Sequence, residues 1–281
     1  MRVGAHVSTA GGLSNAIDRA VQIGAEAIQC FGSSPQSWAF NPVPEDQLIA
    51  FREKAEIHDI SPAFLHAIYL INLGTENPVN VKRGISSLVS YMHLASAIGG
   101  GGVIFHGGSH KGAGYDAIFR QTVDALKEVL SASPDNVDLI IENSAGMGGA
   151  IGSNFQEIGK ILESVDSTRM KVCLDTQHAF ASGHQLMTKD GVEETMEEFD
   201  REIGLDKLVA VHANDSKRPF QSGVDRHENI GLGFMGDGAF TAIMNHPAFS
   251  DVPFILEVPG IEGKGPDQEN IDKLKSLRPK I

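Results

Sequence analysis

Side chains that could bind metal ions close six short apolar segments of this chain. Three of the segments end in a carboxylate, at Glu142, Asp175 and Glu257. A carboxylate at the end of a buried strand must be paired or must bind a cation, because burying it alone costs several kcal/mol or more. Three carboxylates that converge would repel one another, and divalent cations are the simplest remedy. The other three segments end in or next to a histidine, and these histidines are His66, His106 and His212.

Three further candidate ligands follow the same segments closely. Asp175 and His178 lie three residues apart, across the turn that leaves the Asp175 segment. Asp225 and His227 lie two residues apart, which places both side chains on the same side if the backbone is extended. One tetrahedral zinc takes about four ligands, so the nine candidates suit two or three ions rather than one. Histidine and carboxylate ligands without thiolate favour zinc, with Mn²⁺ or Fe²⁺ as alternatives.

The elements that must position these residues alternate between apolar strands and segments of helical periodicity. Near-continuous apolar segments are typical of parallel strands buried on both faces. Eight alternating units favour a closed (β/α)8 TIM barrel, in one domain over residues 1–281, and an open doubly wound sheet is the alternative. In a barrel the carboxyl ends of the strands surround one mouth, so the candidate ligands would converge. The predicted strands are Arg2–Val7, Ala27–Phe31, Ala63–Ala67, Val103–His106, Leu139–Glu142, Lys171–Asp175, Leu208–His212 and Phe254–Glu257.

Helical periodicity fills most of the intervals between the strands. Gly24, Gly99 and Gly204 stand where three of the helices should stop. Three long irregular stretches follow strands, where a barrel places its functional loops: Gly32–Asn41, Gly107–Gly114 and Asn214–Gly238. The predicted helices are Gly12–Ile23, Pro44–His58, Val79–Ala97, Tyr115–Ser131, Asn154–Ser164, Val192–Ile203 and Phe240–Asn245.

The composition limits the class of protein. With 23 Lys and Arg against 36 Asp and Glu, the formal net charge is −13, which argues against a broad basic surface for nucleic acid. Bound divalent cations would reverse the charge locally. Cys30 and Cys173 lie in apolar segments and are expected to be core residues in a reducing compartment. The chain lacks a signal-peptide pattern and an apolar segment of membrane-spanning length. We therefore expect a soluble, cytoplasmic protein, and a monomer.

Several motifs in order along the whole chain resemble endonuclease IV, the zinc-dependent apurinic/apyrimidinic endonuclease family. The segments CLDTQHAFASG and DRHENIG are the most specific. The resemblance implies a TIM barrel with three zinc ions. It implies hydrolysis of the phosphodiester bond 5′ to abasic sites in duplex DNA, a step of base excision repair that leaves a 3′-hydroxyl and a 5′-deoxyribose phosphate. The other matching segments read GAHVSTAGGL, HAIYLINLG, FHGGSH, ENSAG, HANDSK and LEVPG.

The resemblance also assigns the nine candidate ligands to individual ions, and all nine are present. Glu142 would bridge two zinc ions and act in catalysis. The first ion would be held by His66, His106 and Glu142, the second by Glu142, Asp175, His212 and Glu257, and the third by His178, Asp225 and His227.

The same comparison suggests DNA contacts in two loops. Tyr69 and Leu70 match residues with which the family fills or wedges the DNA at the lesion, although Tyr69 alone is equally typical of a partly buried loop aromatic. Gln36 and Ser37 are the candidates for minor-groove contacts in the other loop, but some family members have Arg-Gln there before the tryptophan, so the resemblance does not settle these contacts. Gly107 replaces a proline that is frequent in the family, which should not alter metal coordination.

Two other functions fit the same residues less well. A metal-dependent sugar isomerase or epimerase on a TIM barrel would need one or two ions, and the third ligand set, His178 with Asp225 and His227, argues against it. A non-catalytic protein that binds damaged DNA would be expected to have lost ligands, and none is missing.

Overall fold

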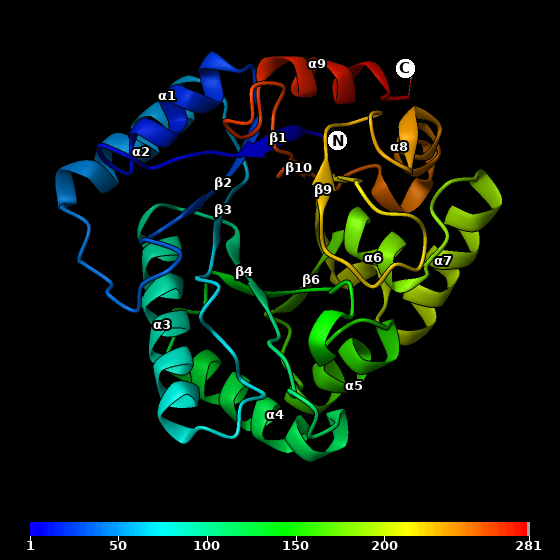
Figure 1. Ribbon diagram of the computed structural model, residues 1–281. Helices are drawn as coiled ribbons and strands as arrows, with labels where there is room; N and C mark the ends of the chain where they lie inside the picture. Colours follow the sequence, from blue (N-terminus) through cyan, green and yellow to red (C-terminus); the bar gives the residue numbers. More distant parts are fainter. Residues whose placement is uncertain (280–281) are drawn as a thin grey trace.

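Eight short segments rich in branched apolar residues form parallel strands that close into a barrel. The structure is a computed structural model that describes residues 1–279 (Figure 1). The strand order is β1-β10-β7-β6-β5-β4-β3-β2, and pairing of Val3 with Phe254 closes the ring. The predicted barrel is confirmed, and the open sheet is excluded. The barrel strands are β1 Val3–His6, β2 Ala27–Phe31, β3 Ala63–His66, β4 Gly102–His106, β5 Asp138–Glu142, β6 Met170–Asp175, β7 Leu208–His212 and β10 Phe254–Leu256.

Helices surround the barrel as an outer ring, which Figure 1 shows along its axis. Gly24 and Gly99 follow the ends of two of them with φ of 75° and 68°, a left-handed conformation that glycine adopts without a steric cost. Both glycines were predicted to stop helices. The helices are α1 Asn15–Gln22, α2 Glu45–Ile57, α3 Pro78–Ala97, α4 Tyr115–Ser131, α5 Phe155–Val165, α6 Thr176–Ser182, α7 Lys189–Glu202, α8 Gly236–Asn245 and α9 Gln268–Ser276.

The structure corrects the sequence analysis at several helices. The segment after Asp175 was predicted as a turn, but α6 begins there directly, with the Asp175 carboxylate accepting a hydrogen bond from the His178 backbone N–H at 2.7 Å. Helix α9 was not predicted, because few of its residues are apolar. Helices α7 and α8 begin one turn before their first predicted residues, since their first turns are polar or glycine-rich.

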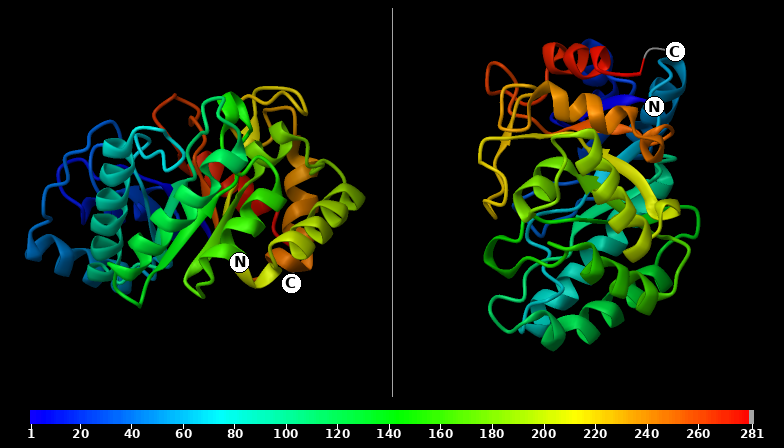
Figure 2. Two further views of the ribbon diagram at one scale, coloured as in Figure 1. Left: turned by 90° about the horizontal axis from the view of Figure 1, so that it is seen from below. Right: turned by 90° about the vertical axis from the view of Figure 1, so that its right-hand side faces the viewer.

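The long segment after β7, predicted as irregular, contains a small antiparallel ladder of β8 (Asp215–Ser216) and β9 (His227–Glu228). The buried Asp215 carboxylate accepts hydrogen bonds of 3.0–3.1 Å from four backbone N–H groups of residues 231–236. These bonds order the loop between β9 and α8. The side views in Figure 2 show the loops gathered at one end of the barrel.

Apolar side chains fill the molecule in two layers. A large core lies between the strands and the helices, and a smaller one fills the inside of the barrel. Cys30 and Cys173 are both buried and free, as expected for core residues. The inner core consists of Ala27, Phe64, Ile104, Ile140, Cys173, Ala210 and Ile255.

The carboxylate of Glu26 connects the first barrel strand, β1, to the last helix of the described residues, α9. Glu26, just before β2, accepts hydrogen bonds from the Val3 backbone N–H at 2.9 Å and from the guanidinium of Arg278, and it pairs with Lys275 of α9 at 3.2 Å. Burial alone would raise the pKa of Glu26, but these donors lower it from 4.5 to about 2. Within residues 1–279, no helix combines the length and the apolar character that crossing a membrane requires.

Candidate metal centre

The alternation of side chains along a strand brings the predicted ligands to the barrel mouth. Residues two apart on a strand point to the same side. His66 lies two residues beyond the inner-core residue Phe64, and Glu142 lies two beyond Ile140. The same spacing separates Ile104 from His106, Cys173 from Asp175, Ala210 from His212, and Ile255 from Glu257. The six side chains therefore form a polar layer on top of the apolar inner core.

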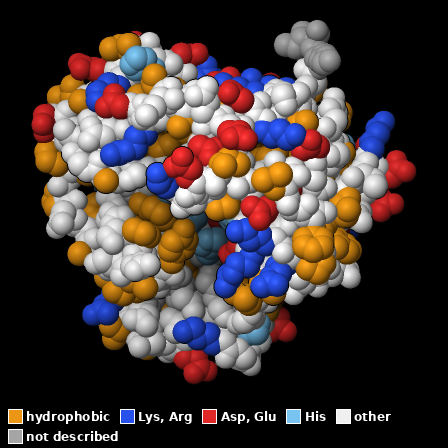
Figure 3. Space-filling model, turned by 45° about the horizontal axis from the view of Figure 1, so that its top comes forward, with side chains coloured by type: hydrophobic (Ala, Val, Ile, Leu, Met, Phe, Trp, Pro, Cys, Tyr) orange, Lys and Arg blue, Asp and Glu red, His pale blue; other side chains and the backbone are white. Residues whose placement is uncertain are grey.

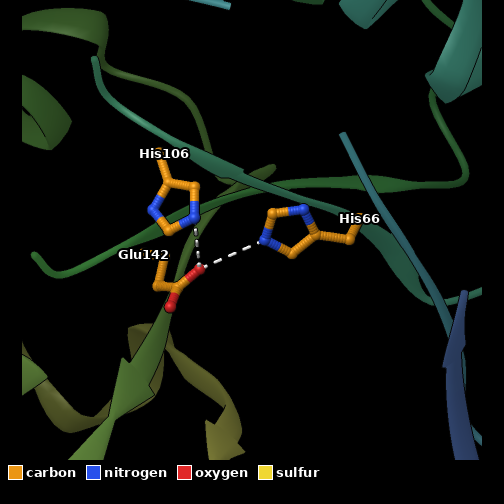
Figure 4. A group of neighbouring side chains, drawn as sticks. All are labelled: His66, His106 and Glu142. Atoms are coloured by element: carbon orange, nitrogen blue, oxygen red, sulfur yellow. Dashed lines mark hydrogen bonds and ion pairs between the residues drawn. The ribbon is translucent and has the colours of Figure 1, made fainter. Parts of the chain in front are cut away.

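The first group consists of His66, His106 and Glu142, on three neighbouring strands (Figure 4). Glu142 Oε2 lies 3.3 Å from His66 Nε2 and 3.6 Å from His106 Nε2. Glu142 and His66 are buried, whereas about a third of the His106 side chain is exposed. Both imidazoles thus aim one nitrogen at the same carboxylate oxygen.

The second group uses the other oxygen of the same glutamate. Glu142 Oε1 lies 3.0 Å from His212 Nδ1, and that nitrogen lies 3.3 Å from Glu257 Oε2 and 3.9 Å from Asp175 Oδ2. These four residues offer ligand atoms that all lie within 4.8 Å of one another. Because its two oxygens face different groups, Glu142 is placed to be shared between two ions.

The third group combines α6 with the β8–β9 segment. Asp225 lies 3.2 Å from the Nε2 atoms of both His178 and His227. Asp175, His178 and His227 also offer ligand atoms within 4.8 Å of one another, with the Asp175 carboxylate 3.8 Å from His227. The structure therefore brings together all three side chains predicted for this ion and adds the Asp175 carboxylate as a fourth candidate ligand nearby.

Backbone carbonyls hold three of the candidate imidazoles through the ring nitrogen that faces away from the carboxylates. His66 Nδ1 donates to the backbone carbonyl of Ala67 at 2.8 Å, and His178 Nδ1 donates to that of Asn143 at 2.9 Å. His227 Nδ1 donates to the carbonyl of Glu257 at 3.4 Å. A bond at one ring nitrogen leaves the other with a lone pair for a cation. The Nε2 atoms of His178 and His227 are buried and lie 3.2 Å from the Asp225 carboxylate, but neither forms a hydrogen bond with any residue in the described range 1–279. This donor set fits metal ions, which would satisfy both atoms.

The electrostatics of the cluster also favour bound cations. Burial alone would raise the pKa of Glu142, but the imidazoles of His106, His212 and His178 lower it well below its ordinary value. Burial lowers the pKa of His178, but Asp175, Asp225 and Glu142 raise it well above the ordinary value. Glu142 is therefore ionised at neutral pH, and a positive charge at His178 is stabilised.

A pocket of about 520 Å³ opens beside the first and third groups. Figure 3 shows a hollow on this face with histidine in its depth, hydrophobic side chains on one side and Lys and Arg side chains on another. Tyr69 and Leu70 line the pocket, yet 59% and 39% of their surfaces are exposed. The Tyr69 ring packs against Phe31 and His66, with centroids 5.4 and 5.8 Å away.

The two predicted DNA-contact loops lie side by side. The Tyr69 backbone N–H donates to Pro35 O at 3.2 Å, which joins its loop to the one that carries Gln36 and Ser37. Gln36 is exposed and Ser37 is partly buried.

Two buried asparagines hold Asp175, and the sequence analysis did not find them. Asn143 accepts from the Asp175 backbone N–H at 2.6 Å, and Asn214 donates to Asp175 Oδ2 at 2.7 Å. Asn143 directly follows the ligand Glu142 and Asn214 lies two residues beyond the ligand His212, and these positions next to strand ends were the available signal.

Comparisons with known proteins place the chain in a family. The family model described as "Xylose isomerase-like TIM barrel" matches residues 17–279. A protein of Halothermothrix orenii named "Probable endonuclease 4" is 38% identical to this chain, and the alignment covers 98% of this chain and 99% of the relative. The chain belongs to the endonuclease IV family. The crystal structure of endonuclease IV from Thermus thermophilus matches with a TM-score of 0.87 and 30% identity, over 99% of this chain and 98% of the other.

Beyond the endonuclease IV family, the likeness is one of fold. A D-tagatose 3-epimerase-like protein matches with a TM-score of 0.76, over 99% of this chain and 97% of the other, but only 17% of the residues are identical. The endonuclease IV barrel is thus shared with proteins of other names, and the side chains at the mouth must decide the chemistry.

Proposed function

We propose that this chain hydrolyses the phosphodiester bond on the 5′ side of abasic sites in duplex DNA. The products would be a 3′-hydroxyl and a 5′-deoxyribose phosphate, and three zinc ions would be the cofactor. The observation that supports this most strongly is the convergence of three ligand groups at one barrel mouth. A sugar isomerase or epimerase would need only one or two ions, so the third ligand group would have no function in it.

The nine ligands would divide among the three ions as the three groups do. When bound, the ions would supply a positive field for the phosphate oxygens and lower the pKa of a bound water towards ~7. His66 and His106 would hold the first ion with Glu142, which also faces the second. The remaining ligands would be Asp175, His212 and Glu257 for the second ion and His178, Asp225 and His227 for the third.

The chain itself supplies ionised carboxylates and fixed imidazoles rather than a nucleophile. Hydrolysis joins a water oxygen to phosphorus and breaks the bond from phosphorus to the 3′ oxygen, which leaves with a proton. Neither cysteine can replace the water, because burial raises the pKa of Cys30 to about 12 and that of Cys173 to about 11. Glu142 stays ionised and keeps both oxygens available to its two groups.

The loops around the mouth would bind the DNA. Tyr69 and Leu70 are exposed, apolar and next to the metal centre, so they can fill the gap that a missing base leaves in the duplex. An abasic nucleotide has no base to unstack, so turning it into the pocket costs less than turning out a normal nucleotide. Gln36 and Ser37 would contact the minor groove from the adjoining loop. The bound cations would offset the net charge of −13 at the point of contact.

The direct test is incision of an end-labelled duplex that carries one abasic-site analogue. We expect one cut on the 5′ side of the lesion, no cut in undamaged duplex, and loss of activity after a strong chelator removes the metal. Zinc should restore the activity.

Cleavage that persists in fully demetallated protein would contradict the metal centre. Folded, zinc-loaded protein that leaves the lesion intact would contradict the proposed substrate, and turnover of sugars would then be the reaction to assay.

A further inference from the structure

Every barrel strand places a side chain at the level of the metal centre, but two of these side chains belong to none of the three groups. They are His6 on β1 and Gln29 on β2, each two residues beyond an inward-facing position, at Gly4 and Ala27. Gln29 is fully buried. A buried amide must find hydrogen-bond partners, so its contacts indicate its role.

The Gln29 amide joins residues of three other strands. Its Nε2 lies 2.6 Å from Glu257 Oε1 and 2.9 Å from His6 Nδ1, and its Oε1 lies 2.8 Å from His212 Nε2. An ionised carboxylate only accepts hydrogen bonds, so the amide N–H must face Glu257. The reversed amide would set two oxygens 2.6 Å apart. The orientation of the amide is therefore fixed.

This orientation determines the tautomer of His212. Gln29 Oε1 can only accept, so His212 Nε2 must carry a proton and donate it. In the neutral imidazole the lone pair is then on Nδ1. Nδ1 is the atom that faces the carboxylates of the second group, 3.0 Å from Glu142 and 3.3 Å from Glu257. The imidazole is thus set to bind a cation at that point.

We propose that Gln29 is a positioning residue of the metal centre. Its single amide fixes the tautomer and ring orientation of His212 and holds the carboxylate of Glu257, so two ligands of the second ion are pre-oriented. This inference rests on the metal centre of the proposed function. The other rings described above, His66, His178 and His227, use backbone carbonyls for the same purpose. The orientation of His212 depends on a side chain and can be tested by substitution.

The first variant is Gln29→Leu, which keeps a similar volume without polar atoms. Loss of such a supporting hydrogen bond typically lowers metal affinity 10–100-fold. In the full chain we expect one of three zinc ions to be released at ~10–100-fold lower concentration of a competing chromophoric chelator, with the other two unchanged. If Gln29→Leu does not fold, Gln29→Met keeps the unbranched shape and replaces it.

Two further variants separate positioning from packing. Ile28→Val, on the same strand, removes one buried methylene from the outside of the barrel at a cost of ~1 kcal/mol in stability, and all three zinc affinities should stay unchanged. Gln29→Glu can still accept from His212 but cannot donate to Glu257 and adds a negative charge beside it. We expect Gln29→Glu to lose the same ion.

Nitrogen NMR of the zinc-loaded protein gives a second readout that packing alone would not change. The chemical shift of the His212 Nε2 proton should show its hydrogen bond to Gln29 in the natural chain, and this signature should be lost in Gln29→Leu. Three zinc ions of unchanged affinity together with an unchanged His212 Nε2 proton signal in Gln29→Leu would overturn the positioning role, even if its thermal stability fell. A natural chain that binds no zinc would overturn the metal centre itself, so its titration is performed first.

Discussion

Replacing Glu142 with glutamine is the sharpest perturbation of the proposed mechanism. Glutamine keeps the shape of the side chain but turns one oxygen into an amide nitrogen, which has no lone pair for a cation. Oε2 faces His66 and His106 at 3.3 and 3.6 Å, while Oε1 faces His212 and His178 at 3.0 and 3.2 Å. Whichever way the amide turns, one ligand group loses its shared oxygen.

We expect Glu142→Gln to lower kcat at least ~100-fold, which corresponds to ~2.7 kcal/mol of transition-state stabilisation. The zinc content should fall by at least one ion, while circular dichroism stays unchanged because β5 keeps its pairing. Incision of the end-labelled abasic duplex under single-turnover conditions measures the rate. Glu128→Gln, the same charge change on an exposed part of α4, is the control and should retain full activity. If Glu142→Gln incises at the rate of the natural chain, Glu142 has no part in the mechanism.

Three other perturbations test separate parts of the molecule. The pKa of Glu26 is lowered to about 2, so its ion pairs stabilise the fold above pH ~4.5 and this contribution is lost as the pH falls towards 2. Because these side chains are about a third exposed, we expect Glu26→Gln to cost ~1–2 kcal/mol at pH 7 in urea unfolding, and the difference from the natural chain should vanish near pH 2. Tyr69→Ala should lower kcat/KM for abasic duplex ~10–100-fold with unchanged zinc content, since stacking of an aromatic ring on a base is worth ~1–3 kcal/mol; unchanged kinetics would exclude Tyr69 from DNA binding. Asp215→Ala leaves five backbone donors without their carboxylate and should cost at least ~3 kcal/mol in the same unfolding assay, whereas a loss below ~1 kcal/mol would mean that water replaces the carboxylate.

The barrel could be predicted from the sequence because its strands are apolar segments with few competing patterns. Strands such as Leu139–Glu142 and Lys171–Asp175 end in a carboxylate, which is costly to bury in an apolar environment. The sequence therefore indicated both where the strand ends and that its last residue binds a cation or another partner. Helix α9 was missed because Ile271 and Leu274 are its only buried apolar residues. Helix α6 was missed because no loop separates it from β6.

The chemistry of single polar residues was harder to see. Gln29 stands in Ala-Ile-Gln-Cys-Phe as an isolated polar residue, and nothing local indicates that it reaches Glu257 and His212. The approach of Asp175 to His227 likewise depends on where the long segment after β7 returns to the barrel. These contacts join residues far apart in the chain, and their partners follow only from the closed geometry.

The pairing of β1 with β10 also has a consequence for the synthesis of the protein. Val3 emerges from the ribosome 251 residues before its partner Phe254. Until then, β10 is missing between β1 and β7, so one hydrogen-bonding edge of each strand has no partner. An exposed strand edge can pair with another chain. Contacts of such long range form slowly, so the growing chain passes through a stage in which the barrel cannot close. The last ligand, Glu257, appears at the same moment as closure, which makes the complete metal centre a product of the final stage of folding.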